Sequence, residues 1–214
     1  MLLSPPVPDE LNVTASGGAP AVGVAETTTV GAAEAVIDFT VPAATVAHAR
    51  VAADKGVAMV IGTTGLSPEQ SAEIHAAAKK VPILWAANMA VGVNVLLSLV
   101  EKTAAMLDPA YDIEVLEMHH RHKIDAPSGT AKALGNAIAE GRGQTHDRVA
   151  VTDRNGERKR GQIGYASLRG GMVVGDHTVI FASERERIEL THKASSRDIF
   201  AEGAVAAARW VKGK

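Results

Sequence analysis

The sequence of 214 residues predicts an α/β protein that combines a parallel sheet with a second, α+β domain built on a mixed sheet. Short apolar strands alternate with helical segments between residues 35 and 90, which is typical of a parallel sheet. After residue 90 the order changes, and three β-like stretches follow one another. Aromatic residues make up only 3% of the chain, so small side chains must pack the helices closely on the sheets.

The first part reads as strand, helix, strand, helix, strand. The expected elements are strands at 35–39, 57–61 and 81–86, and helices at 43–55 and from 68 to about 80. Gly56 can end the first helix in a left-handed conformation. Ser67, Pro68 and Gln70 have the spacing of an N-cap, a first helical proline and a capping box. Two loops, 62–65 and 86–90, follow strand ends, where parallel sheets bind their ligands.

The second part begins with an amphipathic helix. We expect helices at 92–107, 128–140 and 195–210, a strand at 111–118, and β-like stretches at 161–168, 172–182 and 187–193. Residues 1–34 are rich in Pro and Gly and show no sustained period, so we expect an irregular segment without a strand there. The predicted domains are 1–34, then 35–90 with 196–214, and 91–195.

Composition excludes several functional classes. The formal charge of −2 gives no basic field for nucleic acid, and the absence of cysteine excludes disulfides and thiolate chemistry. No apolar run approaches the roughly 18 residues of a membrane span. We therefore expect a soluble, cytoplasmic protein with no nucleic-acid or membrane partner.

The segment from Glu117 to Thr130 is the richest in titratable side chains. It can be a solvated basic turn, or a metal site built on His119, His120 and His122, although these histidines lack the i, i+4 spacing of ligands on one helix face. A third interpretation is an anion site. A helix that begins at Ser128 offers free N–H groups to a small dicarboxylate, and histidines nearby can move protons at neutral pH.

Residues 117–131 match the pattern E-x-H-H-x-x-K-x-D-A-P-S-G-T-A, and the chain here resembles the 4-hydroxy-tetrahydrodipicolinate reductases. Further segments are similar to that family in the same order: Val36–Thr40, Ile61–Gly65, Ala87–Asn94, Arg160–Gly164, Arg169–Gly171, Gly175–Thr178 and Glu189–Arg197. The resemblance covers residues 35 to 214. It implies NADH- or NADPH-dependent reduction of 4-hydroxy-tetrahydrodipicolinate to tetrahydrodipicolinate in the diaminopimelate route of lysine biosynthesis, by a homotetramer with a Rossmann-type first domain.

The resemblance also assigns roles to residues. It makes His119 the acid–base group and Lys123 a proton donor, with both catalytic. It assigns the substrate carboxylates to His120, Gly129 and Thr130, and the cofactor to Gly62, Thr63, Thr64, Ala86, Ala87, Asn88 and Met89. No metal is expected. His177 and His192 lie in strand-like stretches and read as structural, and Arg158 reads as part of a solvated loop.

The chain departs from the family near its N-terminus. The family's first strand, its G-x-x-G-x-M-G loop and the following helix and strand have no counterpart in these 214 residues. We expect a Rossmann-type sheet that is incomplete, an N-terminally truncated copy and weak binding of NAD(P)H. The alternative function is a catalytically impaired copy that keeps substrate binding and oligomerisation only.

Overall fold

A computed structural model describes residues 13–14 and 33–214. The chain forms two compact units: unit 1 comprises Met1–Ala87 with Glu202–Lys214, and unit 2 comprises Asn88–Ala201. No helix in the described part of the chain has both the length and the apolar character that crossing a bilayer requires.

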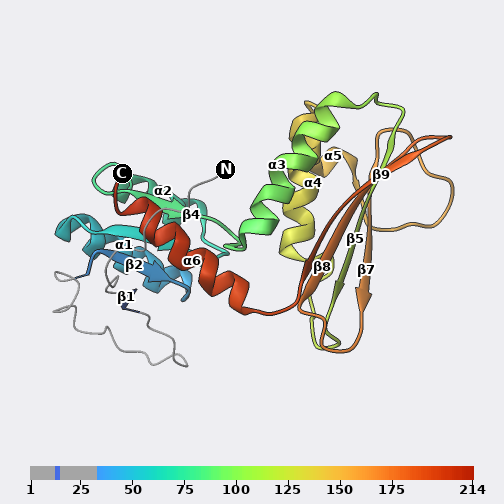
Figure 1. Ribbon diagram of the computed structural model, residues 1–214. Helices are drawn as coiled ribbons and strands as arrows, with labels where there is room; N and C mark the ends of the chain where they lie inside the picture. The colour runs from blue at the N-terminus through green and yellow to red at the C-terminus, as the bar shows by residue number, and fades with distance from the viewer. Residues whose placement is uncertain (1–12, 15–32) are drawn as a thin grey trace, which may run out of the picture. The chain divides into compact units, whose positions relative to one another are not determined.

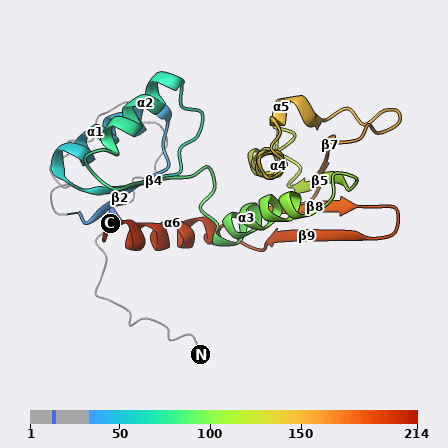
Figure 2. The ribbon, with the colours of Figure 1, turned by 90° about the horizontal axis from the view of Figure 1, so that it is seen from above.

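Unit 1 contains a four-stranded parallel sheet, sheet A, in the order β1-β2-β3-β4. Its strands are β1 (Val13–Thr14), β2 (Ala35–Asp38), β3 (Ala58–Ile61) and β4 (Ile83–Trp85). Its helices are α1 (Pro42–Lys55), α2 (Pro68–Ala77) and the larger part of α6 (Asp198–Val211). Figure 2 shows α1 and α2 on one side of this sheet and α6 on the other. The layered parallel sheet confirms the predicted fold class.

Local signals explain where the helices of unit 1 begin and end. Gly56 ends α1 with φ 70°, a left-handed conformation that costs glycine nothing. Ser67 begins α2: its hydroxyl accepts from the backbone N–H of Gln70, while the Gln70 side chain accepts from the Ser67 N–H. The capping box predicted from the sequence is therefore confirmed.

One element lies in the segment that was expected to be irregular. Val13 and Thr14 form β1, which pairs in parallel with Ala35 and Val36 of β2. The expectation of no strand before residue 35 is therefore wrong at these two positions. A strand of two residues is too short to show a hydrophobic period in the sequence, and only its backbone pairing reveals it. The remaining residues of that segment, 1–12 and 15–32, lie outside the described residues.

Unit 2 holds a five-stranded mixed sheet, sheet B, in the order β6-β7-β5-β8-β9. Its strands are β5 (Asp112–His119), β6 (Ala150–Val151), β7 (Ile163–Arg169), β8 (Gly175–Ala182) and β9 (Arg187–Ala194). Its helices are α3 (Val91–Met106), α4 (Gly129–Gly141) and α5 (His146–Val149). β5 pairs in parallel with β7 and antiparallel with β8, which confirms the predicted mixed sheet. The short elements β6 and α5 have no counterpart in the sequence prediction.

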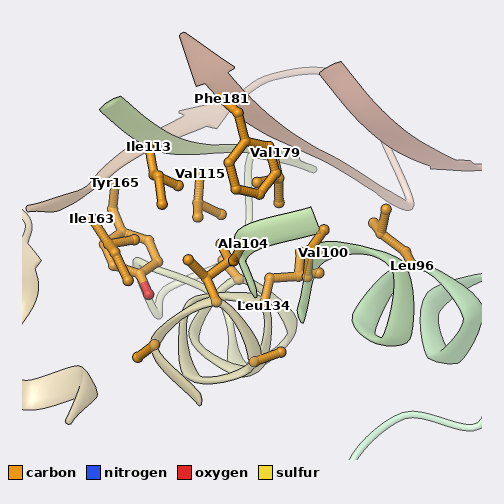
Figure 3. Close-up of a cluster of buried hydrophobic side chains, with 14 residues drawn as sticks. Leu96, Val100, Ala104, Ile113, Val115, Leu134, Ile163, Tyr165, Val179 and Phe181 are labelled. Carbon is orange, nitrogen blue, oxygen red and sulfur yellow. The ribbon is translucent and has the colours of Figure 1, made fainter. Parts of the chain in front are cut away.

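The core of unit 2 lies between sheet B and the helices α3 and α4, which Figure 1 shows on one face of the sheet. Strand β5 alternates strictly between half-buried and buried residues, and its buried side chains face the helices. Leu134 of α4 and Val100 of α3 pack against Val115 and Phe181 in this layer (Figure 3). Apolar side chains thus fill the space between this end of sheet B and the two helices.

Candidate active site

The helix-facing side of sheet B changes from apolar to polar along its strands. On β5 the buried side chains follow in the order Ile113, Val115, Glu117 and His119. The register sets Ser167 of β7 and His177 of β8 opposite Glu117, and Arg169 opposite His119. Polar side chains from three strands therefore gather at the end of the sheet where β5 runs into the loop before α4.

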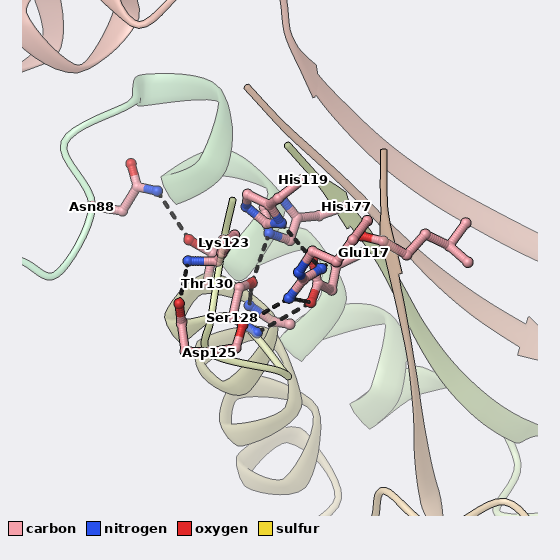
Figure 4. A network of polar contacts seen from close by, with 11 residues as sticks. Asn88, Glu117, His119, Lys123, Asp125, Ser128, Thr130 and His177 are labelled. Carbon is pink, nitrogen blue, oxygen red and sulfur yellow. Dashed lines mark hydrogen bonds and ion pairs between the residues drawn. The ribbon is translucent and has the colours of Figure 1, made fainter. Parts of the chain in front are cut away.

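Glu117 lies at the centre of this polar cluster (Figure 4). One of its oxygens, Oε2, is hydrogen-bonded to His119 Nδ1. Arg169 donates to both carboxylate oxygens, at 2.9 and 2.8 Å. Burial by itself would raise the pKa of the Glu117 carboxyl, but the hydrogen bonds from Arg169 and Ser167 outweigh it and hold that pKa below its ordinary value. Glu117 is therefore an ionised carboxylate beneath the histidine.

His177 packs against His119 edge to face, with ring centroids 5.1 Å apart. Its Nε2 lies 3.2 Å from the Ser128 hydroxyl. Burial lowers the pKa of His177 to about 4, and the neighbouring His119 adds to the shift. His177 is thus a neutral, buried imidazole that joins β8 to the start of α4, in agreement with its interpretation as a structural residue.

The start of α4 presents backbone donors. The Ser128 hydroxyl accepts from the backbone N–H of Ala131 at 3.2 Å and so satisfies one of the free N–H groups of the first turn. The N–H groups of Gly129 and Thr130 have no acceptor among residues 13–14 and 33–214. A Cβ built on Gly129 would meet nothing within 4 Å, so a ligand can reach this backbone. The geometry suits an anion such as a carboxylate.

The loop between β5 and α4 carries the predicted proton donor. Lys123 Nζ lies 2.8 Å from Asp125 Oδ1, and Arg169 donates to the Asp125 carbonyl at 2.7 Å. The Lys123 N–H donates to the His120 carbonyl at 3.1 Å. Burial, and next the positive charge of Arg197, lower the pKa of His120. Its Nδ1 is buried and has no hydrogen-bond partner among the described residues.

Unit 1 holds the glycine loop after β3. Here the Thr63 side chain turns inward: it is 4% exposed, donates to Asp38 Oδ2 at 3.4 Å and accepts from the Thr40 N–H at 2.9 Å. Trp85 Nε1 donates to the Thr63 carbonyl at 3.1 Å. These contacts fix the loop's backbone, so any cofactor contact made by Thr63 must use its N–H group rather than its side chain.

The same loop also presents free backbone donors. The N–H groups of Thr63 and Thr64 have no acceptor within the described parts of the chain. A Cβ on Gly62 would lie 2.1 Å from the ring of Phe39, an aromatic side chain that is 52% exposed. Free backbone donors beside an exposed aromatic ring are features of a small-molecule site. Ala86 and Ala87 belong to the next loop of this unit.

The structure places the predicted site residues in both units. Unit 2 contains His119, His120, Lys123, Gly129 and Thr130, together with Asn88 and Met89. Asn88 Nδ2 donates to Thr130 Oγ1 at 3.1 Å, and its Oδ1 accepts from the Ala90 N–H. Asn88, predicted from the family resemblance to bind cofactor, thus contacts a residue predicted to bind substrate, and Met89 is buried.

Sequence reasoning did not assign Glu117 or Arg169 to the site. The sequence could have indicated Glu117, because it lies two and four residues after the apolar Val115 and Ile113 and so faces the same buried side of β5. Arg169 lies on another strand, and its only signal was its place in the family-like segment Arg169–Gly171. The structure also corrects the interpretation of Arg158 as solvated: its side chain is 18% exposed and its Nε lies 2.9 Å from Asp112 Oδ1, where it fastens a loop to the far end of β5.

No group of three or more histidine, cysteine, aspartate or glutamate side chains is placed to hold a metal ion in residues 13–14 and 33–214. The His119 ring faces Glu117 and His177, whereas the rings of His120 and His122 lie 6.3 Å apart by their centroids. The arrangement favours the anion site over the metal site.

Comparison with known families gives two matches that together span most of the chain. Residues 10–89 match the model described as dihydrodipicolinate reductase, N-terminus, and residues 92–214 match dihydrodipicolinate reductase, C-terminus.

Similar proteins include three named 4-hydroxy-tetrahydrodipicolinate reductase. That of Rhodopseudomonas palustris (strain TIE-1) is 53% identical over 185 residues, which cover 85% of this chain and 68% of the relative. That of Dinoroseobacter shibae is 56% identical over 185 residues, covering 85% and 69%. That of Parvibaculum lavamentivorans is 53% identical over 208 residues, covering 94% and 77%.

Among solved structures, the dipicolinate-bound dihydrodipicolinate reductase from Paenisporosarcina sp. TG-14 superimposes with a TM-score of 0.71. It is 27% identical in sequence, and the match covers 85% of this chain and 70% of that one.

Proposed function

This chain belongs to the dihydrodipicolinate reductase family, and we propose that it reduces 4-hydroxy-tetrahydrodipicolinate to tetrahydrodipicolinate in the diaminopimelate route of lysine biosynthesis. The observation that carries the proposal lies in unit 2. A buried histidine on an ionised glutamate, His119 on Glu117, lies beside a helix start with two free N–H groups. This arrangement combines proton transfer with dicarboxylate binding, which the reaction requires.

Substrate binding is assigned to the first turn of α4 and to His120. One carboxylate accepts from the N–H groups of Gly129 and Thr130, where the helix dipole favours negative charge. The half-buried ring of His120 is a second polar contact. The similar Paenisporosarcina reductase was solved with dipicolinate, a planar dicarboxylate, which agrees with a site of this kind.

Proton transfer is assigned to His119 and Lys123. Glu117 holds His119 through Nδ1, so Nε2 is the nitrogen that exchanges a proton with the substrate. Lys123 supplies positive charge and a proton beside the substrate anion, and Asp125 holds its ammonium group in place. The substrate loses its hydroxyl as water to give a cyclic imine, and the proton from these groups, together with the hydride that a bound cofactor would supply, completes the reduction.

The nicotinamide cofactor supplies the hydride when it is bound. We assign its binding to Gly62, Thr63, Thr64, Ala86, Ala87, Asn88 and Met89. In the glycine loop the N–H groups of Thr63 and Thr64 act as donors. Both NADH and NADPH are candidates, and parallel titrations with each cofactor, followed by fluorescence, distinguish them.

Two substitutions test the reaction. His119→Gln and Lys123→Ala should each lower kcat by about 10²–10⁴-fold, the usual contribution of a positioned acid or base. Oxidation of the reduced cofactor is followed at 340 nm with freshly generated substrate. Lys102→Ala, which removes an exposed lysine of α3, is the matched control and should keep the wild-type kcat.

The outcomes separate the reductase from an impaired copy. If wild type binds dipicolinate but oxidises neither NADH nor NADPH in the presence of substrate, the chain is an impaired copy that only binds substrate. If wild type turns over and His119→Gln turns over equally fast, the assignment of His119 fails.

We also propose a homotetramer that associates through the outer face of sheet B. On this face, opposite the helices, the register brings together apolar side chains that are half-buried or exposed: Leu116, Met118, Ala166, Leu168 and Ile180. Leu168, which is 49% exposed, is suited to a test. Leu168→Glu should lower the mass measured by light scattering, whereas Leu99→Glu on α3 should not; a wild-type monomer at micromolar concentration overturns the proposal.

The reaction itself suggests where the protein acts. It consumes a reduced nicotinamide cofactor and a soluble dicarboxylate, so we propose a cytoplasmic location. Fractionation of cells that express the tagged chain tests this assignment.

A further inference from the structure

We propose that Glu117 is a positioning residue that holds the acid–base group and the substrate-binding turn in one arrangement. Its Oε2 is hydrogen-bonded to His119 Nδ1, and its Oε1 accepts from the backbone N–H of Ser128 at 3.3 Å. Ser128 immediately precedes the two free N–H groups of α4. The inference rests on the proposed function, because it concerns how that site is built.

The burial of Glu117 argues for a specific role. Its side chain is fully buried on a strand whose preceding inward residues are apolar, Ile113 and Val115. A buried charge costs free energy unless it is paired and fully hydrogen-bonded, and an apolar side chain would serve packing alone at least as well. Instead, Arg169 donates to both oxygens of Glu117. This bidentate geometry holds a carboxylate in one orientation.

The first consequence concerns the tautomer of His119. An ionised carboxylate can only accept, so the hydrogen must reside on Nδ1 while the ring is neutral, and Nε2 carries the free lone pair. Gly175 of β8 keeps that nitrogen accessible, because a Cβ there would lie 3.0 Å from Nε2. Glu117 therefore decides which nitrogen faces the substrate.

The second consequence concerns the chain segments around the site. Arg169 donates to Glu117 and also to the carbonyl of Asp125, whose side chain holds Lys123. The Glu117–Arg169 pair thus connects β5, β7, the loop that carries Lys123 and the start of α4. Loss of the carboxylate would loosen the acid–base group and the anion-binding turn together.

The charged groups that face His119 set the expected pH dependence. Glu117 on β5 is the negative neighbour. The others are Arg169 on β7, His177 on β8, and His120 and Lys123 in the following loop, which are cationic or neutral. Glu117→Gln removes this negative neighbour and leaves the others in place. The alkaline limb of the kcat–pH profile, where the acid loses its proton, should then move to lower pH.

The experiment compares Glu117→Gln and Glu117→Asp with a matched control, Glu114→Gln. Glu114 is also a carboxylate of β5 paired with arginines, Arg154 and Arg158, but it lies on the outer face. Glu117→Gln should lower kcat about 10–100-fold, part of the acid–base contribution, and shift the alkaline limb to lower pH. Glu117→Asp keeps the charge and should retain the position of that limb. Glu114→Gln should keep the wild-type kcat and profile.

A second readout does not depend on activity or on a variant. Long-range ¹H–¹⁵N spectra of the wild-type protein report which imidazole nitrogen of His119 carries hydrogen, and we expect Nδ1. A His119 with its hydrogen on Nε2 alone overturns the proposal, as does a folded Glu117→Gln whose kcat and pH profile equal those of wild type. A wild-type chain that does not turn over, but shows hydrogen on Nδ1, would refute the proposed function and leave the role of Glu117 in place.

Discussion

The buried imidazole of His177 makes a quantitative prediction about stability in acid. Burial lowers the pKa of His177 from 6.5 to about 4 in the folded protein. The unfolded chain therefore takes up a proton at higher pH than the folded chain does. Its contribution to stability is complete above the unfolded pKa and is lost as the pH falls through 6.5 towards the folded pKa.

The magnitude follows from these two values. Between about pH 7 and about pH 4.5, the linkage relation gives a loss on the order of 2 kcal/mol in the free energy of unfolding. A domain is stable by only about 5–15 kcal/mol, so a loss of this size is readily measured. Carboxyl groups also titrate in this pH range. The quantity to compare is therefore the difference in the free energy of unfolding between wild type and a variant that lacks this imidazole.

The variant is His177→Gln, which replaces the imidazole by a polar amide that does not titrate. Urea unfolding is followed by far-ultraviolet circular dichroism at a series of pH values, because both tryptophans, 85 and 210, lie in unit 1 and do not report on unit 2. We expect the stability of the variant to fall less steeply below about pH 6.5 than that of wild type. His75→Gln, on exposed α2, controls for the loss of a histidine as such. Parallel curves for wild type and His177→Gln would refute the reasoning.

Three further substitutions give smaller tests. Gly135→Ala would place a Cβ 1.6 Å from the Tyr165 hydroxyl, so we expect a loss of about 1–3 kcal/mol in urea unfolding despite the better helix propensity of alanine; an equally stable variant would contradict this. Gly62→Ala would displace the Phe39 ring, 2.1 Å from its Cβ, and should raise the Kd for NADH at least about tenfold in a fluorescence titration, and an unchanged Kd would remove the loop from the cofactor site. Ser67→Ala removes one half of a capping box and should cost about 1 kcal/mol in the same unfolding assay; no change would show that α2 is held by packing alone.

Features decided by neighbours in the sequence were predicted well. The start of α2 depends on Ser67, Pro68 and Gln70, which lie within four positions, and the alternation of β5 depends on residues two apart. Short elements were missed for the same reason: β1 and β6 span two residues each, too few for a period. The family resemblance pointed to His119 and the Ser128 N-cap predicted the start of α4, and both lie in one continuous segment.

The chain's own residues thus determined the order of the elements, the fold class and the segment that carries the chemistry. Only the tertiary structure decided which side chains complete that segment. Arg169 reaches Glu117 from 52 positions away because β7 pairs in parallel with β5. His177 reaches Ser128 because β8 pairs antiparallel with β5. Strand register sets such contacts, and a shift of one residue would turn Glu117 from the core to the outer face. Local patterns are set by bonds along the chain, whereas a buried charge is placed by partners that the chain meets only after it has folded.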